Sequence, residues 1–258
     1  MNRLRDELSI IGLTKLESDM ARIRQHGTIN MLIGRLLDGV FDLGKLIQPG
    51  DIGLGAFHGL DGEMIVLDGI CYQARADGVV RVAETGARSP YVTLGTFEDP
   101  RAIDFQAIEG FASLSKRLDA ELADTNRPAL VRIEGRFPRL KARSVHPQAK
   151  PYSGLAGVAK SQAIFEWIDF EGTIVGVRFP EYLQVLQVAG WHLHAISTDA
   201  ARGGHLLDLQ VESAHVKLES AEGFEVCLPD DESFRKADLP VDVHAEVQRA
   251  ERDANHLE

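Results

Sequence analysis

The chain of 258 residues is poor in cysteine and in aromatic residues. Its only cysteines, Cys71 and Cys227, do not form a C-x-x-C pair, so neither a disulfide framework nor a thiolate zinc site is indicated. Aromatic residues make up 7% of the chain, whereas hydrophobic residues make up 44%. That hydrophobic content suffices for a substantial core, in one large domain or two small ones.

Long apolar runs are also missing. The run at 8–13 is short and flanked by charges of both signs, which does not fit the apolar region of a signal peptide. No later segment approaches the roughly 20 apolar residues that a membrane-spanning helix requires. We therefore expect a soluble, cytoplasmic protein with reduced thiols and no membrane partner.

Positive charge is in deficit. The chain has 28 lysines and arginines against 39 aspartates and glutamates, which gives a formal net charge of −11. A polyphosphate backbone would be repelled, so nucleic acid is not an expected partner. The 24 glycines form neither a G-x-G-x-x-G motif nor a P-loop, so no phosphate cradle is indicated either.

Short apolar runs separated by Asp-Gly turns dominate from Asp51 onward, and they predict a sheet-rich fold with few helices. Predicted strands include 52–57, 64–67, 70–74, 91–94, 130–134, 163–170, 173–179, 206–212 and 214–218. Helical periodicity predicts an amphipathic helix over 3–24, a second helix over 28–40, a third over 111–122 and a polar C-terminal helix over 241–254. The first of these helices fits a subunit contact and docking onto the body equally well.

A loop that contains proline and glycine, 147–157, is the best candidate boundary between two halves. We therefore divide the chain into an N-terminal helical extension (1–27), an N-terminal sheet subdomain (28–157), a C-terminal sheet subdomain with the histidines described next (158–240), and a C-terminal helix or tail (241–258).

Three of the nine histidines are concentrated in one stretch. If 191–196 is a strand, His192 and His194 project from the same face with Cα atoms about 6.6 Å apart. The turn at Gly203-Gly204 would bring His205 back beside them on a second strand. Three neutral imidazoles with an open fourth position suit a catalytic zinc, although imidazole also accepts iron, copper and nickel. The alternative is that they are hydrogen-bonded strand histidines without a metal.

Two further features bear charge near expected strand ends. Glu63 follows the Asp61-Gly62 turn, where a carboxylate is usually solvated and matters only if a site lies beside it. A basic cluster follows the strand at 130–134, and its members are Arg136, Arg139, Lys141 and Arg143. The planar fork of arginine is suited to binding a carboxylate, but a solvated or salt-bridged strand face explains most of these four.

Over roughly residues 28–251 the chain resembles the α-acetolactate decarboxylases. The resemblance rests on ordered matches, which are 51–55, 59–64, 91–93, 150–152, 165–166, 172–176, 180–182, 190–194 and 203–208. It implies an α+β fold of two mixed β-sheet subdomains with the metal site between them, in a homodimer. By position it implies that His192, His194 and His205 bind Zn²⁺, and that Glu63, Arg143 and Glu251 are the catalytic residues.

The resemblance also implies a reaction, the zinc-dependent decarboxylation of (S)-2-acetolactate to (R)-acetoin and CO₂. Zinc would chelate the hydroxyl and ketone oxygens and stabilise an enediolate, and Arg143 would orient the departing carboxylate. Glu63 and Glu251 would deliver a proton to one face, as a coupled pair.

The chain departs from the family pattern at two positions. Ala56 stands where the family often has threonine, and His58 where it often has asparagine, so a hydroxyl is lost and an imidazole gained near the expected site. Two alternative functions follow. One is a cupin-like metal-dependent oxygenase or hydrolase, and the other is a non-catalytic relative that binds a hydroxy-keto acid.

Overall fold

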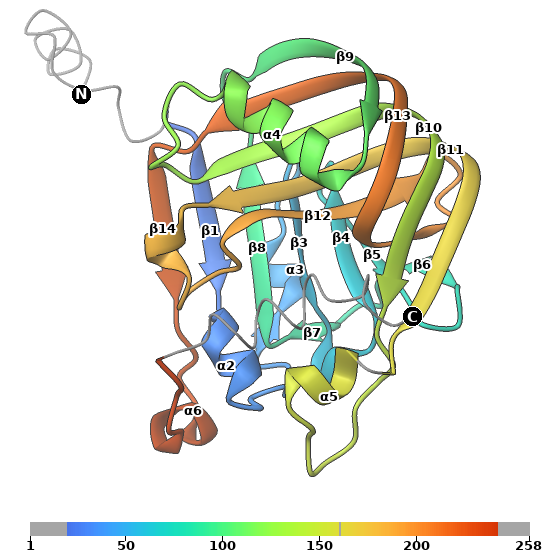
Figure 1. Ribbon diagram of the computed structural model, residues 1–258. Coiled ribbons are helices and arrows are strands. Elements are labelled where there is room, and N and C mark those ends of the chain that lie inside the picture. Colours follow the sequence, from blue (N-terminus) through green and yellow to red (C-terminus); the bar gives the residue numbers. More distant parts are fainter. Residues whose placement is uncertain (1–19, 160, 242–258) are drawn as a thin grey trace, which may run out of the picture.

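The computed structural model describes residues 20–159 and 161–241, which form two packed sheets with a few short helices (Figure 1). The larger sheet has seven strands. Their order is β14 (Gly223–Cys227), β1 (Arg22–His26), β8 (Tyr91–Thr96), β3 (Ile52–Ala56), β4 (Glu63–Leu67), β5 (Ile70–Ala74) and β6 (Val80–Val82). Only β1 and β14 run parallel, so this sheet is mixed.

The second sheet has five antiparallel strands and lies across the first (Figure 1). Their order is β10 (Ala129–Ser144), β11 (Ala163–Phe179), β12 (Gly190–Ser197), β13 (Gly203–Ser220) and β9 (Arg101–Glu109). β10 also pairs with β13, from Ala129 opposite Ser220 to Arg143 opposite His205. A small sheet of two strands, β2 (Phe41–Asp42) and β7 (Arg88–Ser89), completes the strand pairing of the described residues.

The helical elements are short. They are α2 (Ile29–Ile33), α3 (Leu43–Leu46), η2 (His58–Leu60), α4 (Phe111–Glu121), α5 (Leu155–Ala159), η3 (Glu181–Leu183) and α6 (Glu232–Lys236). Within the described ranges, no helix has both the length and the apolar character needed to cross a membrane.

A shared apolar layer holds the two sheets together. Ile52, Leu54 and Ile65 from the large sheet pack with Val175 and Ile196 from the small one, and all five are at most 2% exposed. Close packing between neighbouring strands also explains why Gly176 has no side chain. A Cβ on Gly176 of β11 would lie 2.3 Å from the carbonyl oxygen of His192 on the neighbouring β12. The strand that carries the histidines can therefore approach β11 closely.

The predicted fold class is confirmed as two sheets with few helices, although only the seven-stranded sheet is mixed. The helix predicted over 3–24 is wrong at its end, because 22–26 is strand β1 and 1–19 lie outside the described residues. The helix predicted over 28–40 ends at Ile33. Gly34 and the left-handed backbone of Arg35 (φ 63°) terminate it. The helix predicted over 241–254 falls almost entirely outside the described residues.

Sheet membership does not follow chain order at the loop 147–157. β9 and β10 precede this loop and belong to the five-stranded sheet, whereas β14 follows it and belongs to the seven-stranded sheet. The division of the chain into four domains stays a prediction.

Candidate metal centre

The β12–β13 hairpin brings the three histidines together. Its register places His194 directly opposite His205, and His192 lies two residues before His194 on the same face. All three side chains are buried, with exposed fractions of 6% for His192, 1% for His194 and 4% for His205. The turn itself is 198–202, whereas Gly203 and Gly204, which the sequence placed in the turn, are already strand residues of β13 opposite Ile196 and Ala195.

The imidazole nitrogens converge on one point. His192 Nε2 lies 3.1 Å from His205 Nδ1 and 3.2 Å from His194 Nε2, and the last two atoms are 3.3 Å apart. A ring nitrogen carries one hydrogen or one lone pair in the ring plane, so hydrogen bonds alone cannot satisfy all three contacts. Three nitrogens bound tetrahedrally to zinc at 2.0–2.1 Å would be about 3.3 Å apart. The donor set thus fits a divalent metal ion.

Neighbouring groups fix the state of two rings. His194 Nδ1 lies 2.7 Å from the carbonyl oxygen of Met64 on β4, and because a carbonyl only accepts, this nitrogen carries the proton and Nε2 faces the cluster. Burial, together with the positive charge of Arg143, lowers the pKa of His192 to about 3. His192 is therefore neutral at neutral pH, which is the form that binds a metal.

Glu63 and Arg143 form a buried ion pair beside the histidines. Glu63 opens β4 of the large sheet, and Arg143 lies on β10 directly opposite His205. Arg143 Nη1 is 3.3 Å from Glu63 Oε1, and the other oxygen of Glu63 is 3.7 Å from His194 Nε2. Both side chains are less than 10% exposed. The structure therefore brings five of the six predicted site residues together, and the sixth, Glu251, lies outside the described residues.

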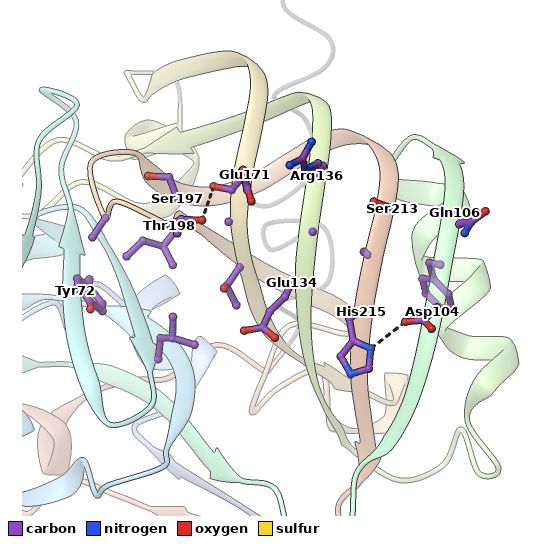
Figure 2. Close-up of a pocket in the computed structure, with 18 residues that line it drawn as sticks. Tyr72, Asp104, Gln106, Glu134, Arg136, Glu171, Ser197, Thr198, Ser213 and His215 are labelled. Carbon is purple, nitrogen blue, oxygen red and sulfur yellow. Dashed lines mark hydrogen bonds and ion pairs between the residues drawn. The ribbon is translucent and has the colours of Figure 1, made fainter.

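Two other members of the basic cluster lie away from the centre. Arg139 donates to Asp208 at 2.6 Å and lies 3.6 Å from Glu166, as a salt-bridged strand residue. Arg136 lines a surface pocket of about 640 Å³ on the five-stranded sheet, to which Tyr72 of the large sheet also contributes (Figure 2). None of the five residues gathered at the centre is among the described residues that line this pocket.

A small cavity of about 60 Å³ adjoins the centre. Glu63, Arg143 and His192 form its polar end. Apolar side chains from α2, α5 and nearby strands form the rest, and they are Ile29, Leu32, Ala56, Leu60, Tyr91, Val145, Leu155 and Val158. The sequence analysis missed α5 altogether and placed Ile29 and Leu32 on a helix without assigning them to a site, because apolar periodicity does not distinguish a cavity wall from a core.

The two departures from the family pattern lie in different places. Ala56 lines the cavity, so the missing hydroxyl is a property of the site. His58 is exposed, and its Nδ1 accepts a hydrogen bond from the backbone N–H of Gly39 at 2.9 Å. The added imidazole therefore belongs to the surface.

Comparisons with known proteins agree on one family. A sequence model described as alpha-acetolactate decarboxylase matches residues 23–241. The alpha-acetolactate decarboxylase of Methanosarcina mazei is 36% identical over 228 residues, which cover 88% of this chain and 79% of that protein. The one from Bacillus subtilis is 31% identical over 232 residues, covering 90% and 91%.

Two solved structures have the same fold throughout. The crystal structure of alpha-acetolactate decarboxylase from Bacillus subtilis strain 168 matches with a TM-score of 0.86 and 31% identity, over 90% of this chain and 99% of that one. A Staphylococcus aureus protein, described as of unknown function and similar to alpha-acetolactate decarboxylase, matches with a TM-score of 0.85 and 30% identity, over 89% and 100%.

Proposed function

Because the chain belongs to the alpha-acetolactate decarboxylase family, we propose that it converts (S)-2-acetolactate to (R)-acetoin and CO₂ with Zn²⁺ as its metal. The observation that carries this proposal is the convergence of three buried imidazoles beside the Glu63–Arg143 pair, at the polar end of an apolar cavity. Acetolactate combines a carboxylate, a hydroxyl and a ketone with two methyl groups, so it suits a cavity with one polar end.

His192, His194 and His205 would hold the metal through the three nitrogens that face one another. Zinc bound there would supply a Lewis acid for the hydroxyl and ketone oxygens, where negative charge develops as CO₂ leaves. Three nitrogen donors and a free fourth position are typical of catalytic zinc.

Arg143 would bind and orient the substrate. Its guanidinium pairs with Glu63 and lines the same cavity, so a planar cationic donor faces the space that the substrate would occupy. A planar guanidinium can bind the substrate carboxylate with two hydrogen bonds before that group leaves as CO₂.

Glu63 would handle the proton. Its Oε2 faces His194, and its Oε1 is held by Arg143, so the carboxyl group reaches the cavity from one side only. Delivery of a proton from one side gives acetoin of one hand. Glu251 is proposed as the second carboxylate, on the resemblance alone, and the apolar walls from α2 and α5 would exclude water from the reacting carbon.

The decisive experiment measures metal content, CO₂ release and acetoin chirality on one preparation. We expect one zinc per chain and (R)-acetoin from the wild type, and loss of both metal and activity in His194→Ala. His215→Ala is the matched control. His215 is exposed, and its Nδ1 lies 2.9 Å from Asp104 Oδ1, at a place on the surface that is not part of the metal centre. A zinc-loaded wild type that binds acetolactate and releases no CO₂ would refute the proposal, and so would oxygen uptake that requires iron.

We also propose that the enzyme acts as a homodimer in the cytoplasm. The dimer is implied by the family resemblance, and the location by the two cysteines, which fit reduced thiols. Light scattering on the purified protein tests the first point, and cell fractionation the second.

A further inference from the structure

A second cavity, of about 780 Å³, lies away from the metal centre between α2, the segment that follows it, the loop at 150–152 and α6. Most of its wall is apolar and comes from Met31, Leu36, Val40, Pro151 and Phe234. Its volume is within the usual range for small-molecule sites, and none of its described lining residues belongs to the proposed active site.

Arg35 supplies the available positive charge of this cavity. Its side chain makes no hydrogen bond or ion pair with another residue in 20–159 or 161–241, in a chain that carries a net charge of −11. The other cation in the wall, Lys150, donates to the carboxylate of Asp38 at 2.5 Å. The guanidinium of Arg35 is therefore available to an anion.

Arg35 adopts a left-handed backbone conformation, which is strained for any residue that has a Cβ. The residue has a φ of 63°, directly after α2. The N–H of Leu36 bonds to Met31 O at 2.9 Å and the N–H of Arg35 bonds to Leu32 O at 3.0 Å, which is the Schellman arrangement at a helix end. Glycine is favoured at this position because a Cβ is strained there.

The acidic groups of the cavity are already engaged. The Asp38 carboxylate accepts from Lys150 and from the Tyr152 hydroxyl at 2.6 Å, and Asp231 accepts from the N–H of Phe234 at 3.1 Å at the start of α6. Each acidic group of the cavity thus has a donor within this protein, whereas the guanidinium of Arg35 has no acceptor among the described residues, so a ligand carboxylate would meet Arg35. We propose that this cavity binds a small aliphatic monocarboxylate, with its carboxylate on the Arg35 guanidinium and its chain against the apolar wall.

Calorimetric titration of the metal-loaded enzyme with hexanoate tests this site. We expect saturable binding by the wild type, and binding at least about tenfold weaker for Arg35→Gly, as the loss of one charge-assisted hydrogen bond implies. The same variant should melt no lower than the wild type, because glycine relieves the left-handed backbone. Hexanol and hexylamine should each bind at least about tenfold more weakly than hexanoate to the wild type.

Arg136→Ala is the matched control, because Arg136 is also exposed and also lacks a side-chain partner among the described residues, but lines a different pocket, on the five-stranded sheet (Figure 2). It removes the same charge and should bind hexanoate like the wild type. Equal affinity of Arg35→Gly and wild type would overturn the proposal and place the hexanoate elsewhere, for example at the metal. Equal binding of hexanol would also overturn it, because Arg35 would then play no part.

Discussion

Glu63 illustrates how much a single buried carboxylate can do at this centre. It holds Arg143 through one oxygen and faces His194 through the other, with 9% of its side chain exposed. Exchange for glutamine keeps the shape of the side chain and removes its ability to carry a charge or to transfer a proton. This variant can therefore separate proton delivery from metal binding.

We expect Glu63→Gln to retain its metal and to lose activity by about 10²–10⁴-fold in kcat, the usual contribution of a general acid or base. Stability should fall by up to about 3–5 kcal/mol, because Arg143 would remain buried without its counter-charge. Steady-state kinetics, metal analysis and a thermal melt measure the three effects. Glu166→Gln is the control, since Glu166 is half exposed and lies 3.6 Å from Arg139 on the surface. An unchanged kcat would remove Glu63 from the mechanism.

At the scale of residues, the histidine set could be predicted from local spacing, and the ion pair could not. His192, His194 and His205 lie on one hairpin, so strand alternation and a short connecting turn suffice to place them. Glu63 and Arg143 are 80 positions apart and come from different sheets. The residues alone offered each of them as a weak candidate, and only the resemblance joined them to the histidines, because no short-range pattern links residues on separate sheets.

Among the elements, α5 depends on contacts made outside its own five residues. It contributes Leu155 and Val158 to the cavity wall beside the centre. The loop that precedes it is tied to Asp38, which accepts from Lys150 and Tyr152. Burial and Asp38 raise the pKa of the Tyr152 hydroxyl to about 12, so it remains a donor throughout the working range.

The link at Asp38 should depend on pH. Burial favours a higher pKa for Asp38, but hydrogen bonds from Lys150 and Tyr152 outweigh it, so the pKa lies below the ordinary 3.8. A carboxyl whose pKa is depressed on folding stabilises the protein above its unfolded-state pKa, and loses that effect as the pH falls through its folded-state pKa. We expect Asp38→Asn to cost about 1 kcal/mol at pH 7 and almost nothing in acid below that pKa.

Urea unfolding at pH 7 and in acid measures this difference. Lys150→Met provides the comparison, and the double variant should lose less than the sum of the single losses, because the two residues share one interaction. Equal losses at both pH values would show that the Asp38 charge does not stabilise the loop.

Element boundaries were harder to predict than element types. The α4 helix and most central strands follow their apolar periodicity closely. β1 does not, because Ile23 fits a helical stripe as well as a strand, and its partners lie at 92–96 and 223–227. α2 is shorter than its apolar pattern. Arg35 adopts the left-handed backbone that ends a helix, and sequence rules expect glycine rather than arginine at such a position.

For the molecule as a whole, a salt bridge on a buried aspartate links β1 of the large sheet to the start of β3, on the far side of β8. Arg24 on β1 binds both oxygens of Asp51, at 2.7 and 2.8 Å, just before β3. Thr96 of β8 donates to the same carboxylate at 2.8 Å. The Asp51 side chain is fully buried, so these donors replace the hydrogen bonds that water would make to it.

Arg24→Met should lower the free energy of unfolding by about 3 kcal/mol, because it leaves Asp51 buried with its charge unpaired. For a chain of this size that corresponds to a melting temperature roughly 6–12 °C lower. Arg101→Met removes an exposed partner of Glu121 and should change stability by less than about 1 kcal/mol. A similar melting temperature for both variants would contradict the proposed importance of the buried pair.

The sheet membership of the strands was the least predictable property. β10 pairs with β11 and β13 along nearly its whole length, and β1 pairs with β14 from the far end of the chain. Such pairings depend on which distant strands offer a complementary apolar face, which the alternation within one strand does not specify.

The β12–β13 hairpin should form early in folding, before the rest of the proposed active site is assembled. Its histidines are close together in the sequence, so closing the loop between them costs little conformational entropy. Contacts with Glu63 and Arg143 require the closure of much longer loops. A nascent chain could therefore capture its ion while the surrounding walls are still unformed. Affinity for metal and competence for turnover would then arise at different stages of folding, and a time-resolved refolding experiment should see them separately.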